Sequence, residues 1–210
     1  MSTAKDTYQK IVELTEQTTD LMEKFGAFEP EDQESVLAEA FKSDIAKIKE
    51  EDEIPITLIR CAEMLVGVMT ENVVKTLTLG LDHDNPTVRL LAGDAITHVA
   101  EENIELIKPA VEEVLKSGGT AAEEMPFILT ELDDPEVEKI LERFLGHKNP
   151  EVVASALEAL TEIGNPDIIP VLEKLVDDPR TVASDAEMGD EDTTIGQLAK
   201  DAIAIINDEE

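Results

Sequence analysis

The chain has no tryptophan, one tyrosine and one cysteine among its 210 residues. A single cysteine excludes a disulfide framework and a cysteine-based metal site. Aromatic side chains make up only 3% of the sequence, which disfavours a surface that stacks nucleic-acid bases. No stretch approaches the roughly 18 apolar residues of a membrane span, and the N-terminus lacks the apolar segment of a secretory signal. The sequence therefore predicts a protein without membrane contact, located in the cytoplasm.

Basic residues are also scarce, because 17 Lys and Arg stand against 49 Asp and Glu. The net charge of −32 is spread over segments 1–52, 53–100, 101–150 and 151–210, each of which is negative. A basic groove for the phosphate backbone is not expected, so nucleic acid is not a predicted partner. Molar salt screens such self-repulsion, since the Debye length falls to about 3 Å. The charge therefore favours a halophile as the source, and the alternative is an ordinary acidic protein with a basic partner.

What the sequence does contain is an internal repeat. Residues 84–99 (DNPTVRLLAGDAITHV) and 148–163 (KNPEVVASALEALTEI) align without a gap. Further on, LAKDAI at 198–203 repeats LAGDAI at 91–96 with one substitution. Prolines and a Gly-Gly turn divide the chain into units of about 30 residues, a period typical of solenoids built from stacked supersecondary units.

Apolar spacing and capping residues predict eleven helices and no sheet. Asn85-Pro86 and Asn149-Pro150 each place a capping Asn before a proline at the first helical position. Residues 1–52 are predicted to be an N-terminal cap, and residues 53–210 the repeat array. The expected helices are 4–25, 31–50, 56–70, 71–82, 87–100, 103–116, 120–132, 135–146, 151–163, 166–177 and 194–207.

Small residues are expected where adjacent repeats cross closely. Ala92, Ala156 and Ala199 occupy one column of the repeat, and a shift of one unit adds Cys61. We therefore interpret Cys61 as a small buried residue rather than a reactive thiol. Pro126 falls beyond the first turn of its helix and predicts a kink.

An acidic insertion at about 180–194 interrupts the last unit. Its composition predicts a mobile, solvated loop. Its glycine does not fall where a calcium loop needs one, so no metal site and no cofactor are expected.

The pattern P-x-V-[RV]-x-x-A-x-x-A-[IL]-x-x-[IV], present in both aligned segments, resembles the HEAT repeats. The short period is similar to the HEAT-like subgroup found in phycobiliprotein lyases. The resemblance covers about 55–207 and is weakest in the third unit. It implies an all-α, right-handed α–α superhelix of the HEAT/armadillo type. It also implies that second helices line a concave surface that binds other proteins.

No catalytic constellation is visible, so the chain is not expected to be an enzyme. His83 and His147 lie at the ends of second helices, where the helix dipole accounts for them, and His98 is expected in solvent. HEAT-like deoxyhypusine hydroxylases bind iron through His-Glu pairs, and this sequence has no His-Glu dipeptide. The alternatives left open are a HEAT-like lyase or other enzyme accessory protein, and a nucleic-acid-binding HEAT-like protein.

The few basic residues indicate a binding surface. Six of the nine between residues 55 and 178 lie on predicted second helices. A surface less negative than the rest would admit an acidic partner, because like charges across an interface cost affinity. The sequence thus predicts a non-catalytic scaffold or adaptor for another protein, with a binding set of Lys75, Leu79, Lys108, Lys139, Arg143 and Lys174.

Overall fold

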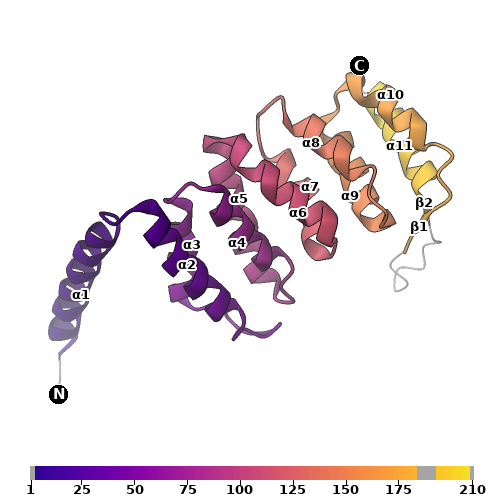
Figure 1. The fold of residues 1–210 in the computed structure, drawn as a ribbon. Helices are drawn as coiled ribbons and strands as arrows, with labels where there is room; N and C mark the ends of the chain where they lie inside the picture. Colours follow the sequence, from indigo (N-terminus) through magenta and orange to yellow (C-terminus); the bar gives the residue numbers. More distant parts are fainter. Residues whose placement is uncertain (1–2, 184–192, 209–210) are drawn as a thin grey trace.

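The computed structural model describes residues 3–183 and 193–208 (Figure 1). Within them the chain forms eleven α-helices in sequential packed pairs, which confirms the predicted all-α solenoid. The helices are α1 Ala4–Phe25, α2 Pro30–Ile45, α3 Ile56–Val66, α4 Glu71–Leu81, α5 Pro86–Glu102, α6 Lys108–Ser117, α7 Thr120–Thr130, α8 Val137–Phe144, α9 Pro150–Ile163, α10 Ile169–Leu172 and α11 Ile195–Asp208. Three 3₁₀ turns accompany them: η1 Ile104–Ile107, η2 Pro166–Ile168 and η3 Glu173–Leu175.

Each unit contributes one helix to each side of the stack. The first helices α3, α5, α7, α9 and α11 pack in that order, each on the next. The second helices α2, α4, α6 and α8 form a parallel series, and α10 packs on α11. One continuous apolar core runs between the two series.

The predicted column of small residues is confirmed. Ala92, Ala156 and Ala199 are fully buried. At the crossing of α4 and α5, a Cβ added to Gly80 would lie 2.7 Å from the Cβ of Ala92, so neither position has room for a larger side chain. Cys61 is buried, its thiol donates to the carbonyl oxygen of Leu37 at 3.4 Å, and burial raises its pKa to about 11. A thiol held protonated in this way is a packing residue.

The capping asparagines also join neighbouring repeats. The Asn85 carboxamide oxygen accepts from the backbone N–H of Thr87 at 2.9 Å, while its Nδ2 donates to the carbonyls of Lys49 and Asp52. Asn149 and Asn165 cap their helices similarly and donate from Nδ2 to the carboxylates of Glu123 and Glu138, respectively. The sequence predicts the caps at residues 85 and 149 but not the bonds to the preceding repeat.

The two repeated histidines contact the asparagines that cap the following helices. Nδ1 of His83 accepts from the backbone N–H of Asn85 at 2.9 Å, and Nδ1 of His147 accepts from that of Asn149 at 3.1 Å. Each ring therefore helps to orient the capping asparagine through Nδ1, and its interaction with the helix dipole stays a prediction. His98 is exposed, as predicted.

The ends of the acidic insertion are more ordered than the loop prediction implies. Strand β1, Thr181–Val182, pairs antiparallel with β2, Thr193–Thr194, so the expectation of no sheet is wrong at this one place. Residues 184–192, which carry most of the predicted loop, lie outside the described part of the chain. Pro126 lies inside α7, which continues through it from Thr120 to Thr130.

The first 45 residues divide into two dissimilar helices. Helix α2 covers the end of the array and buries Leu37, Phe41 and Ile45. Helix α1 buries no residue and stands away from the stack in Figure 1. The core edge is therefore covered by α2, and α1 presents its apolar side chains to solvent.

Candidate functional site

Ion pairs hold three of the five basic residues of the predicted second-helix set. Lys108 at the start of α6 lies 2.5 Å from Glu105 and 3.5 Å from Glu136, and Lys139 on α8 lies 2.6 Å from Glu136. Hydrogen bonding to the Glu105 carboxylate raises the pKa of Lys108, and bonding to Glu136 raises the pKa of Lys139. The Lys139 ammonium in turn lowers the pKa of Glu136. The positive charges of Lys108 and Lys139 are therefore offset by the neighbouring carboxylates of Glu105 and Glu136.

The rest of the set lies apart from this cluster. Arg143 on α8 pairs with Glu112 on α6. Within the described residues, Lys75 on α4 and Lys174 in η3 have no ion pair, and Leu79 is 45% exposed. The structure thus brings Lys108 and Lys139 around one carboxylate and leaves Lys75 and Lys174 separate. Between α6 and α8 the basic side chains Lys108, Lys139 and Arg143 are all paired with carboxylates, so this surface is not a positive patch.

The first helices carry a feature that the sequence interpretation missed. Apolar grooves of about 430, 340 and 780 Å³ lie between α3 and α5, α5 and α7, and α9 and α11. Their apolar side chains include Ile59, Leu90, Phe127, Ala154 and Ile205. Leu90 is 64% exposed and Ile205 48% exposed. Consecutive first helices therefore offer apolar surface to solvent along the array.

Carboxylates border each of these grooves. Glu63 and Asp94 border the groove between α3 and α5, and Asp94 also lines the one between α5 and α7. Glu158 and Asp201 border the largest groove. Apolar surface with an acidic border is complementary to apolar side chains flanked by Lys or Arg.

A signal for this surface exists in the sequence. The repeat alignment assigns Val88, Ala92 and Ala95 to the buried face of α5, and all three are buried. Leu90 falls between those positions, so it has to point elsewhere. An apolar residue off the core face of a first helix is the sign that the second-helix hypothesis overlooked.

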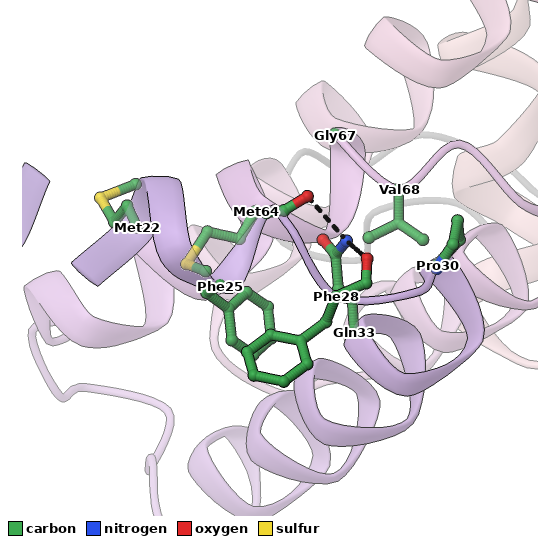
Figure 2. A pocket seen from close by; sticks show the side chains of 9 residues that line it. Met22, Phe25, Phe28, Pro30, Gln33, Met64, Gly67 and Val68 are labelled. Atoms are coloured by element: carbon green, nitrogen blue, oxygen red, sulfur yellow. Dashed lines mark hydrogen bonds between the residues drawn. The ribbon is translucent and has the colours of Figure 1, made fainter. Parts of the chain in front are cut away.

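A fourth pocket, of about 440 Å³, lies where α1 meets the array (Figure 2). Phe25 and Phe28 line it, with ring centroids 6.2 Å apart, and Met22 and Met64 lie beside them. Nε2 of Gln33 donates to the carbonyl oxygen of Phe28 at 2.7 Å and fixes the turn between α1 and α2. The base of α1 is therefore apolar and ordered.

The described residues contain no group of three or more His, Cys, Asp or Glu able to hold a metal ion. Every buried side-chain nitrogen or oxygen described has a hydrogen-bond partner. None of the described helices combines the length and apolarity that a bilayer crossing requires.

Residues 120–189 match the family model of the HEAT repeats. This part of the chain is a HEAT repeat region. It includes α7 and α8, the unit that resembles the repeat pattern least by inspection, and α9 and α10, which resemble it well. HEAT repeats generally serve as protein-interaction scaffolds, so the match indicates protein binding in general. No curated protein matches the chain. The lyase-type subgroup stays a prediction.

Proposed function

We propose that this chain is a non-catalytic scaffold that binds a partner protein through the grooves of its first helices. The partner segment is amphipathic, with apolar side chains flanked by Lys or Arg. One observation carries the proposal: successive first helices form apolar grooves bordered by carboxylates.

Apolar contacts in the grooves determine where on the array the partner binds. Exposed Leu90 and Phe127 flank one groove, and Leu198 and Ile205 line another. Burying such side chains against a partner gains roughly 25 cal/mol per Å² of apolar surface. Grooves that repeat along a rigid array suit a segment longer than one repeat.

The negative charge of the chain determines which kind of partner segment is favoured. A chain with a net charge of −32 attracts basic segments and repels acidic ones. The second-helix surface supports an acidic partner less strongly, because three of its five cations, Lys108, Lys139 and Arg143, are already paired with Glu105, Glu136 and Glu112. The second-helix set, with Leu79 as its apolar member, stays a prediction that the same experiment tests.

The experiment uses a fluorescein-labelled helical peptide with a Leu face flanked by Lys, and a twin in which Glu replaces each Lys. Anisotropy titration of the full chain should show binding of the Lys peptide alone. Leu90→Glu and Phe127→Glu together should weaken it at least tenfold, about 1.4 kcal/mol. Leu79→Glu, a matched exposed leucine on a second helix, should leave it unchanged. Loss of binding in Leu79→Glu with normal binding by the first-helix variant would instead favour the second-helix set.

A further inference from the structure

Helix α1 is a long amphipathic helix that contacts the array only at its base, through Met22 and Phe25. It has 22 residues, none of them buried, and six of its large apolar residues are exposed: Tyr8, Ile11, Val12, Leu14, Leu21 and Met22. Helices in proteins gain most of their stability from packing an apolar face rather than from intrinsic propensity. A stable α1 therefore needs a surface to cover this face.

Part of the apolar face follows the spacing of a coiled-coil seam. Residues 4, 8, 11, 15, 18, 22 and 25 alternate at intervals of four and three, and they are Ala, Tyr, Ile, Thr, Thr, Met and Phe. Such a seam is the surface by which one helix packs along another.

A membrane surface is a poor occupant for this face. The polar side of α1 carries five carboxylates against three lysines, and the whole chain is strongly acidic. Helices that lie in the membrane interface are typically rich in Lys and Arg on that side. Anionic lipids would repel this one.

We propose that α1 pairs antiparallel with α1 of a second copy of this chain. Placing Ile11 against the second copy's Thr18 puts Ala4 against the second copy's Phe25. Tyr8 then lies level with the second copy's Leu21, beside its Met22. The Ala4–Phe25 and Ile11–Thr18 contacts each place a large side chain against a small one, whereas a parallel pair would stack Phe25 on Phe25 and Ala4 on Ala4 and would leave gaps.

Charge favours the same orientation. Lys5 and Glu23 lie along one border of the apolar face, and neither has an ion pair within the described residues. In an antiparallel pair this border of one copy lies beside the same border of the other copy, which runs in the opposite direction. Lys5 therefore lies near the second copy's Glu23. The antiparallel pair also places the two acidic arrays at opposite ends of a helix about 33 Å long. That length is several times the Debye length of about 8 Å at physiological salt.

The base of α1 extends this interface. In the proposed register the second copy's Ala4 lies at Phe25, which lines the apolar pocket with Phe28 and Met64 (Figure 2). The first turn of each helix therefore reaches the pocket of the other copy. The array and the helix together form the contact.

Sedimentation equilibrium of the full chain should give twice the monomer mass of 23.0 kDa. Ile11→Glu should weaken association at least tenfold, while circular dichroism of the array stays unchanged because Ile11 is 57% exposed. Leu90→Glu, an exposed leucine on α5, should leave association intact. Leu90→Glu tests the peptide binding proposed above, and Ile11→Glu tests the dimer. Either proposal can therefore be contradicted while the other holds. A monomer at every concentration, or a dimer unaffected by Ile11→Glu, would overturn the pairing.

Cysteine cross-linking tests the orientation in a Cys61→Ala background. Chains with Ile11→Cys and chains with Thr18→Cys should cross-link when mixed under oxidation, and neither should cross-link alone. In an antiparallel pair the two copies of residue 11 are about 10 Å apart along the axis, too far for a disulfide. Cross-linking of Ile11→Cys with itself, and none in the mixture, would show a parallel pair and overturn the proposal.

Discussion

Nη1 of Arg180 donates a hydrogen bond to the carbonyl oxygen of His147 across 2.6 Å, although 33 positions separate the two residues. Arg89 makes the equivalent bond, at 2.9 Å, to the carbonyl oxygen of His83 only six positions away. The repeat alignment places Val153 where Arg89 stands, and Val153 is buried. The unit that lacks its own arginine therefore receives one from the following repeat.

The Arg180 contact should stabilise the C-terminal end of the array. The guanidinium also donates to the Asp178 carboxylate through Nε and Nη2, at 3.0 and 2.6 Å, so three hydrogen bonds hold it. We expect Arg180→Ala to lower the free energy of unfolding by about 1–3 kcal/mol, because hydrogen bonds to a charged group are lost together. Urea unfolding followed by circular dichroism measures this. Lys148→Ala, an exposed cation close by, should stay within about 0.5 kcal/mol of the wild type.

Sequence inspection could not find this arginine. The repeat pattern aligns residues by position, so it compares Arg89 with Val153 and assigns Arg180 to the loop. The physical requirement is for a cation at the carbonyl of His147, and a side chain from either repeat can meet it. The repeat pattern predicts α5, α9 and their caps well because these depend on local residues such as Asn85 and Asn149. Contacts between repeats depend on the packing.

The same limit applies to the candidate surfaces. The spacing of apolar residues in α1 predicts an apolar face, but not whether the array covers it. The positions of Lys108 and Lys139 predict basic second helices. Their pairing with Glu136 depends on how α6 and α8 approach each other, which the sequence alone does not specify.

Asp178 should make stability depend on acid pH. The Arg180 guanidinium holds the pKa of the Asp178 carboxyl below its usual value. A lowered pKa in the folded state contributes stability above the unfolded pKa of about 3.9 and loses it as the pH falls through the folded value. Wild type should therefore be more stable than Asp178→Asn at pH 6, and the difference should shrink below about pH 4.

The control for this pH dependence is Asp177→Asn, which removes the same charge at an exposed neighbouring position. Its loss should leave stability unchanged or slightly raised, since the chain is strongly negative. An equal effect of the two substitutions at pH 6 would contradict a specific role for Asp178.

The α4–α5 crossing should not tolerate a larger residue. Ala92 is fully buried against Gly80, where even one added carbon would lie 2.7 Å from its Cβ. Ala92→Leu should cost about 1–3 kcal/mol or more of unfolding free energy, because the two helices must separate. Thermal or urea unfolding checks this, with Ala204→Leu on the exposed side of α11 as the control. A stable, unshifted Ala92→Leu protein would mean that the crossing is looser than the structure shows.

Stability should rise steeply with KCl if the charge is an adaptation to high salt. The carboxylates lie mostly at the surface. The described residues form nine cation–carboxylate contacts, which leave most of the 49 acidic residues without a paired cation. At 2 M KCl the Debye length is below about 3 Å, so most of the repulsion between carboxylates is screened. The melting temperature should therefore increase between 0.1 and 2 M KCl. Chloride is used because sulfate would also strengthen apolar burial. An unchanged melting temperature would show that contacts within the array, and not screening, limit its stability, and would leave the acidic surface to be explained by a basic partner.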